Sequence, residues 1–108
     1  MITIKVRKKN GSYEEFISKG HAGYAEAGQD IVCAAVSALV LNMANSVETF
    51  TEDGYEGEMD ERSGGFKFHF TSEISPGSQL LMNSLVLGIR NIGKEYGKKY
   101  INIQFKEV

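Results

Sequence analysis

The segment from Ile31 to about Phe50 constrains the fold more than any other part of this 108-residue sequence. Asp30 is a good N-cap residue, and the residues that follow it predict a helix. The N-terminal half of that helix is apolar nearly all round, with alanines that permit close approach. Because such a helix must be covered on more than one side, we expect a sheet on one face and a partner subunit on another.

Segments with a period of two residues surround this helix and predict strands. Residues 2–6 alternate cleanly, and Asn10-Gly11 after them is a strong hairpin signal because both residues accept positive φ. Further strands are predicted at about 13–18, weakly at 55–61, most clearly at 66–70 after the turn Ser63-Gly64-Gly65, and at 101–105, with Ile101, Ile103 and Phe105 facing inward.

A second helix is predicted after Ser75, with Pro76 in its first turn and Gly97 as its C-cap. Its apolar stripe is expected at Leu81, Leu85, Gly88, Ile92 and Tyr96. The element order β-β-α-β-β-α-β predicts an α+β fold, a single domain over residues 1–108. We expect about five strands in a mixed sheet with two helices on one face, because each helix stripe needs a sheet to cover it.

Composition excludes several classes of function. A formal net charge of −2 provides no basic surface for direct nucleic-acid binding. One cysteine and two histidines are too few for a disulfide or an ordinary zinc site, and no dinucleotide or phosphate-loop motif is present, so we expect no metal and no cofactor. The apolar run 31–41 is broken by Ser37 and too short to cross a bilayer, and no signal peptide precedes it. We therefore expect a cytoplasmic protein without membrane contact.

Cys33 is the candidate nucleophile because it occupies the third position of the first helix. The amides of a first helical turn carry partial positive charge, which stabilises a thiolate. The same amides are candidate donors to the oxyanion of a tetrahedral intermediate. The charge of Asp30 opposes thiolate formation, so a nearby imidazolium would be needed. The alternative is a structural cysteine packed in the core.

The histidine partner has two candidates. His21 lies near the start of the stretch 20–29, whose three glycines and three alanines predict a flexible surface loop. Such a loop can fold back, so a contact between His21 and Cys33 is feasible. His69 alternates with three phenylalanines, so its side chain is expected to face away from the core beside Lys67. Either histidine is also interpretable as an ordinary solvated residue.

The stretch 48–61 carries seven carboxylates and no lysine. Such a charge distribution would attract a basic partner. It is equally interpretable as a solvated acidic edge that discourages strand pairing.

The segment Gly20-His21-Ala22, followed by Gly28-Gln29-Asp30-Ile31-Val32-Cys33-Ala34-Ala35-Val36-Ser37, resembles the signature of the ribosomal-processing cysteine protease family, Prp. That pattern is GHA, a variable loop containing glycine, then G-x-D-I-V-C-A and a serine shortly after. Every one of those positions is filled here. The order of elements, the length and the double-glycine turn before a phenylalanine-rich strand agree with the family as well.

The resemblance implies a Cys–His endopeptidase in which Cys33 is the nucleophile and His21 the general base. Asp30 is implied to position the helix start or the histidine, and Ser37 to support the site by a hydrogen bond. The segment Ala22 to Gln29 matches a loop that orders on substrate, so the expected substrate-loop residues are Gly20, Ala22, Gly23, Tyr24 and Gly28.

The implied substrate is a large-subunit ribosomal protein whose N-terminal extension is cut after an aromatic residue. The implied assembly is a cytoplasmic homodimer. The alternative function is a non-catalytic ribosome-associated binding module in which Cys33 is buried and the loop serves for docking.

Overall fold

The computed structural model describes residues 1–26, 30–60 and 64–108. Its elements follow the predicted order and nearly the predicted bounds. They are β1 (Ile2–Lys9), β2 (Ser12–Lys19), α1 (Ile31–Phe50), β3 (Tyr55–Asp60), β4 (Gly65–Phe70), α2 (Pro76–Tyr96) and β5 (Ile101–Glu107).

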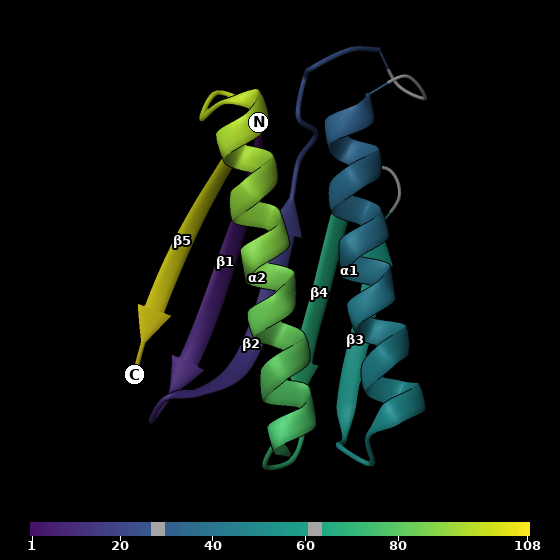
Figure 1. Ribbon diagram of the computed structural model, residues 1–108, viewed down its shortest axis with the longest axis vertical. Helices are drawn as coiled ribbons and strands as arrows, with labels where there is room; N and C mark the ends of the chain where they lie inside the picture. The colour runs from purple at the N-terminus through teal and green to yellow at the C-terminus, as the bar shows by residue number, and fades with distance from the viewer. Residues whose placement is uncertain (27–29, 61–63) are drawn as a thin grey trace.

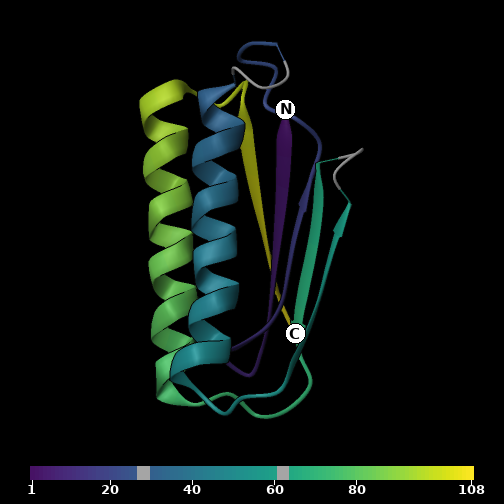
Figure 2. The same cartoon turned by 90° about the vertical axis from the view of Figure 1, so that its right-hand side faces the viewer.

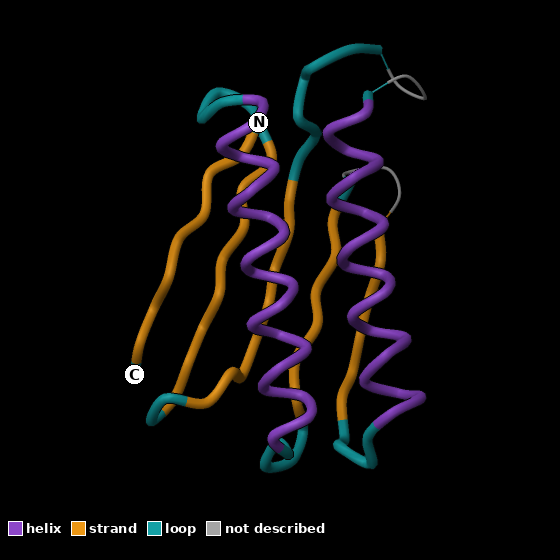
Figure 3. Tube along the Cα trace, viewed as in Figure 1, coloured by secondary structure: helices purple, strands orange, loops and turns teal. Residues whose placement is uncertain are grey.

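The strands form one mixed sheet in the order β3-β4-β2-β1-β5. Neighbours are antiparallel except β1 and β5, which are parallel. Asn10 and Gly11 have φ of 51° and 81°, which confirms the tight hairpin between β1 and β2. Both helices lie side by side on one face of the sheet (Figures 1 and 2), and the Cα trace shows them running along the strands (Figure 3). The predicted fold class is confirmed.

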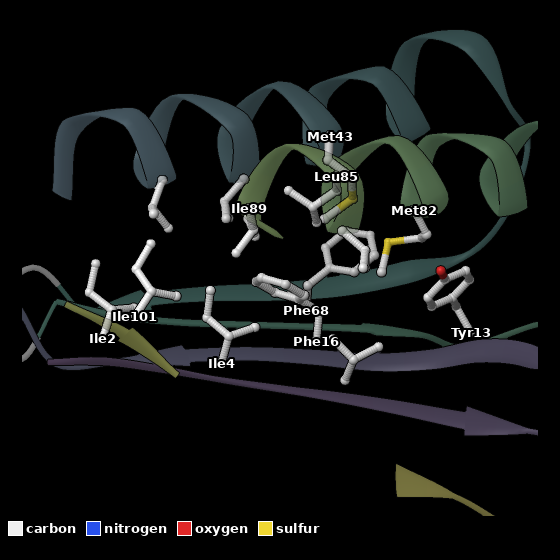
Figure 4. Close-up of a cluster of buried hydrophobic side chains, with 14 of the residues drawn as sticks. Ile2, Ile4, Tyr13, Phe16, Met43, Phe68, Met82, Leu85, Ile89 and Ile101 are labelled. Atoms are coloured by element: carbon white, nitrogen blue, oxygen red, sulfur yellow. The ribbon is translucent and has the colours of Figure 1, made fainter. Parts of the chain in front are cut away.

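The core lies between the helices and the sheet (Figure 4). Four valines of α1 lie on the sheet side, and aromatic and aliphatic side chains rise from the strands to meet them. Burial of each such side chain stabilises the fold by about 1.5–3 kcal/mol. The members with no more than 3% exposure include Ile4, Phe16, Val32, Val36, Val40, Val47, Phe68, Met82 and Ile89.

The buried face of α2 is rotated slightly about the helix axis from the predicted apolar stripe. Its buried residues are Ser78, Met82, Leu85, Val86 and Ile89. Of the predicted stripe, Leu85 is buried, and Leu81, Ile92 and Tyr96 are partly buried and pack against the core. Part of the predicted stripe instead lies on the flank beside α1. A Cβ at Gly88 would come within 2.8 Å of Leu39 Cδ1, so the glycine permits the two helices to approach closely.

Phe105 is on the predicted face of β5 but is 48% exposed, so its predicted inward packing is wrong. The reason is architectural, because β5 is an edge strand that lies beyond α2 (Figure 1). The Arg90 guanidinium lies over the Phe105 ring at 4.8 Å. A cation over an aromatic face gives partial cover to this otherwise open edge.

Helix α1 is longer than its uninterrupted apolar run, and by length and composition alone it meets the criterion for a membrane span, with a mean hydropathy of 1.6. The run 31–41 alone is too short to cross a bilayer, but the prediction did not take the whole helix into account. Core helices of globular domains meet the same criterion, however, and α1 packs its valine face on the sheet. The finding is weak support for a membrane span.

Asp53 ties the end of α1 to the start of α2. Its Oδ2 accepts hydrogen bonds from the backbone N–H and hydroxyl of Ser75 at 3.0 and 2.7 Å, and from the hydroxyl of Ser78. Burial alone would raise the pKa of Asp53, but these donors and Thr51 outweigh it and lower the pKa. Ser78 is fully buried, so its hydroxyl has no access to water in place of Asp53.

We expect Asp53→Ala to lower the free energy of unfolding at pH 7 by about 2 kcal/mol, since it removes hydrogen bonds to a charged acceptor. A carboxyl whose folded pKa is lowered stabilises the fold fully above its unfolded pKa of about 3.9 and loses that effect as pH falls through the folded value. Urea melts at pH 7, 5, 4 and 3 should therefore show the gap between wild type and variant closing below about pH 4.

Glu52→Gln is the control for this series, because Glu52 is an exposed neighbour of Asp53. It should change the free energy of unfolding by less than about 0.5 kcal/mol at each pH. A gap for Asp53→Ala that stays constant down to pH 3 would show that the carboxylate charge is not what stabilises the junction.

Candidate active site

Cys33 lies at the N-terminus of α1, where Asp30 organises the backbone. Asp30 Oδ1 accepts hydrogen bonds from the N–H groups of Val32 and Cys33, each at 3.0 Å, which confirms the predicted N-cap. Burial alone would raise the pKa of Asp30. The backbone donors Cys33, Tyr24 and Val32, together with the Cys33 thiol, outweigh burial and lower the pKa.

The Cys33 thiol is half-buried, and its Sγ accepts a hydrogen bond from the N–H of Ala22 at 3.2 Å. Burial is the largest influence and raises the pKa of the thiol. The hydrogen bond from the Ala22 N–H lowers this pKa, but the charge of Asp30 and its hydrogen bond with the thiol raise it further. The predicted opposition of Asp30 to thiolate formation is confirmed, and burial adds to it, so the helix start by itself does not lower the pKa of Cys33 in this conformation. The amides predicted to stabilise a thiolate or an oxyanion are occupied by Asp30.

The loop between β2 and α1 is held against the rest of the protein over its described part. Ala22 is only 2% exposed, so the expectation that these small residues do not enter the core is wrong at this position. Tyr24 donates its N–H to Asp30 Oδ2 at 3.1 Å, and its ring meets Tyr96 and Tyr100 edge-on. Of the predicted substrate-loop residues, Gly28 lies outside the described residues.

His21 and Cys33 line the same pocket, which has a volume of about 280 Å³. In the described part of the chain no hydrogen bond joins the two side chains. The rest of the lining is mainly apolar and comes from α1 and from the strand ends, a wall that the sequence pattern did not reveal. It includes Ile2, Val36, Val40, Leu41, Met59 and Phe66.

Two glycines make room around His21. A Cβ at Gly20 would lie 2.6 Å from the carbonyl oxygen of Met1, and Gly20 has a φ of +86°. A Cβ at Gly64 would lie 2.7 Å from the carbonyl oxygen of Gly20, and 3.0 and 3.2 Å from Cε1 and Nδ1 of the His21 ring. The turn before β4 therefore lies against the imidazole. From the double-glycine motif we predicted the turn but not this contact with His21.

Ser37 also lines the pocket, one turn along α1 from Cys33. Among the described residues its hydroxyl makes no hydrogen bond to Cys33, so the implied support stays a prediction. Residues 1–26, 30–60 and 64–108 contain no group of three or more His, Cys, Asp or Glu side chains placed to hold a metal ion.

His69 is on the opposite face of the sheet from the helices, as predicted from its alternation with the phenylalanines. Its Nε2 lies 3.2 Å from Glu56 Oε2. Lys67 pairs in register with Glu58 across β3 and β4. Glu56 and Glu58 of β3 therefore have a histidine and a lysine as neighbours on β4, which the linear sequence did not reveal. Because β3 is also an edge strand, the interpretation as a solvated acidic edge is favoured.

A lone thiol at a helix start, sharing an apolar pocket with a histidine, is the arrangement of a cysteine hydrolase. Comparison with known proteins agrees with this class. The family model for cysteine protease Prp matches residues 1–102. The chain belongs to the Prp family of cysteine proteases.

Individual relatives carry the same name. The ribosomal processing cysteine protease Prp of Bacillus subtilis strain 168 is 36% identical over 103 residues, covering 89% of this chain and 90% of that protein. The Prp of Staphylococcus aureus strain NCTC 8325 is 27% identical, covering 98% and 100%.

A crystal structure of S. aureus Prp with a covalently linked product peptide superposes on this chain with a TM-score of 0.91 at 27% identity, covering 98% of this chain and 100% of that one.

Proposed function

We propose that this cysteine protease removes the N-terminal extension of a large-subunit ribosomal protein, cutting after an aromatic residue. Cys33 is the nucleophile and His21 the general base. Substrate enters the pocket beside α1, Cys33 attacks the scissile carbonyl, and His21 takes the thiol proton and returns it to the leaving amine. The whole chain, residues 1–108, serves as one protease domain.

The observation that carries this proposal is the shared pocket of Cys33 and His21 with its apolar wall. Such a wall suits a large apolar side chain next to the scissile bond. The covalently linked product peptide of the S. aureus relative agrees with a nucleophilic thiol. His69 is a poor candidate for the base, because it pairs with Glu56 on the far face of the sheet.

The binding-module alternative requires Cys33 to be a buried structural residue. Cys33 is instead half-buried and lines the pocket, and the family is one of proteases. Alkylation at neutral pH does not separate the two interpretations, since burial and Asp30 raise the pKa of the thiol in the free protein. Turnover is the decisive measurement.

The test incubates the full chain with a peptide that spans the extension and reads the products by mass. We expect one cut, after the aromatic residue, and none in a peptide of the same composition in scrambled order. Absence of cleavage, or equal cleavage of the scrambled peptide, would contradict the proposed substrate.

Gly64→Ala tests whether the turn before β4 positions His21. The added Cβ would meet the imidazole and the Gly20 carbonyl. A displaced base no longer reaches the thiol proton, so we expect kcat/KM for the peptide to fall at least about tenfold. Steady-state kinetics with the extension peptide measures this.

Gly11→Ala is the matched control. Gly11 and Gly64 have φ of +81° and +66°, so alanine at either position costs about 1 kcal/mol of left-handed backbone strain. A Cβ at Gly11, unlike one at Gly64, would meet nothing within 4 Å. Gly11→Ala should keep wild-type kcat/KM. If Gly64→Ala keeps it too, the contact with His21 does not position the base.

We further propose a cytoplasmic homodimer, as the family resemblance implies. The side of α1 turned away from the sheet supports this, because Ile31 remains 49% exposed and Leu41, which also lines the pocket, 41%. Such a surface is suited to a subunit interface. Light scattering coupled to gel filtration should give twice the 11.9 kDa chain mass; a monomer at micromolar concentration would contradict it.

A further inference from the structure

The backbone donors around Cys33 are divided unequally between Asp30 and the sulfur. The N–H groups of Val32 and Cys33 are held by Asp30 Oδ1, and that of Ala34 by the Asp30 carbonyl, each at 3.0 Å. Among the described residues, the one N–H that donates to Sγ is that of Ala22, at 3.2 Å, and it comes from the loop rather than the helix. We propose that the backbone N–H of Ala22 is an oxyanion donor of the protease.

This inference rests on the proposed attack of Cys33 on a peptide carbonyl. In that step a bond forms between Sγ and the carbonyl carbon, and the π electrons of the C=O bond move onto its oxygen. The new oxyanion is two bonds from Sγ, and Sγ is no longer an anionic acceptor. The Ala22 N–H, already directed at Sγ, needs only a small shift to donate to the oxyanion instead.

Collapse of the intermediate restores the C=O bond and breaks the C–N bond. The leaving nitrogen takes its proton from the His21 imidazolium, and water later hydrolyses the thioester. A donor aimed at the oxygen lowers the barrier of both acyl-transfer steps, because charge accumulates on that oxygen in each.

The donor is held in place before substrate arrives. The Ala22 side chain is 2% exposed, which fixes the peptide bond before it. Two residues further on, the Tyr24 N–H is held by Asp30 Oδ2 at 3.1 Å. The Tyr24 ring lies 5.4 Å from that of Tyr96 and 5.2 Å from that of Tyr100, both in edge-on geometry, which aromatic pairs prefer. A preoriented donor costs no reorganisation during the reaction.

The two carboxylate oxygens of Asp30 thus have different roles, which could not be distinguished from the sequence. One oxygen closes the helix start and makes its amides unavailable to substrate, and the other fixes the loop that carries the Ala22 donor. The oxyanion site moves from the helix to the loop as a consequence.

The test removes this one N–H and leaves the side chain in place. Cys33 is the only cysteine, so a synthetic 1–32 thioester can be ligated to residues 33–108 to give the full natural chain. Lactic acid in place of Ala22 turns the peptide bond between residues 21 and 22 into an ester, which has no N–H. Glycolic acid in place of Gly23 is the matched control, because its N–H has no partner among the described residues.

We expect the Ala22 ester to lower kcat about 10²–10³-fold with little change in KM. A peptide aldehyde, which forms a tetrahedral adduct with the thiol, should lose affinity by a similar factor. The Gly23 ester should match the unsubstituted ligated protein in both measurements. The rate of iodoacetamide alkylation as a function of pH measures the thiolate fraction of Cys33 in each protein. The kcat values of the proteins are then compared at pH values that give the same thiolate fraction.

Two results would overturn the inference. One is an unchanged aldehyde affinity in the Ala22 ester. The other is a loss of kcat that disappears when the proteins are compared at the same thiolate fraction, because the Ala22 N–H would then only stabilise the thiolate. Failure of the unsubstituted ligated protein to cut the peptide would instead count against the proposed function. The aldehyde titration needs no turnover and still reports on the donor.

Tyr24→Ala is a second, genetic variant that tests the anchor of the loop. It should lower kcat more than it changes KM, and Tyr24→Phe, which keeps the ring contacts, should restore kcat. Equal kcat for Tyr24→Ala and wild type would show that the ring does not position the donor.

Discussion

Cys33→Ser should lower kcat/KM for the extension peptide by at least about 10⁴-fold. The serine oxygen remains an acceptor for the Ala22 N–H, so the loop keeps its contact. A hydroxyl is far less acidic than a thiol, however, and the single imidazole of His21 does not activate it comparably. Steady-state kinetics with mass detection of the products measures the loss.

Thermal unfolding is the control for this variant. Sulfur and oxygen occupy the same half-buried position, so the unfolding midpoint should move by no more than about 4 °C. A folded Cys33→Ser protein that still cuts the peptide at a substantial rate would exclude Cys33 as the nucleophile.

His21→Ala should lower kcat about 10²–10⁴-fold, the range that a positioned general base contributes. In the proposed mechanism the thiol would lose the group that takes its proton, and burial and Asp30 already disfavour the thiolate. His21 is exposed, so its removal leaves no cavity in the core. The pH profile of kcat/KM, compared with wild type, shows whether a titrating base has been lost.

His69→Ala is the matched control, because it removes the other histidine from the opposite face of the sheet. Its partner Glu56 is largely exposed, so the cost in stability should be below about 1 kcal/mol. We expect wild-type kinetics. Loss of activity in His69→Ala with retention in His21→Ala would reassign the base.

Local features of the sequence were sufficient to predict the elements. Asp30 and Ser75 cap their helices through side chains that bond the first-turn amides, and Asn10-Gly11 adopts the positive φ of its turn. These interactions involve residues within a few positions of one another, so the sequence alone specifies them. The pattern also identified Cys33 and His21, although their roles remain predictions.

Features that depend on distant segments could not be predicted in this way. The core face of α2 is rotated because α1 packs beside it at Gly88. Phe105 is exposed because β5 is an edge strand that α2 covers only in part. Hydrophobic periodicity indicates which residues are apolar, but the arrangement of the layers decides which of them are covered.

Cys33 shows the same division within a single side chain. Its place at the start of α1, after the cap Asp30, was determined by the sequence, because helix and cap are local structures. Its chemical state was decided by the tertiary structure. Asp30 takes the helix amides, the buried Ala22 directs its N–H at the sulfur, and Gly64 approaches His21 from another turn. Desolvation and hydrogen bonding depend on which groups meet in space, and that is decided only when the chain packs.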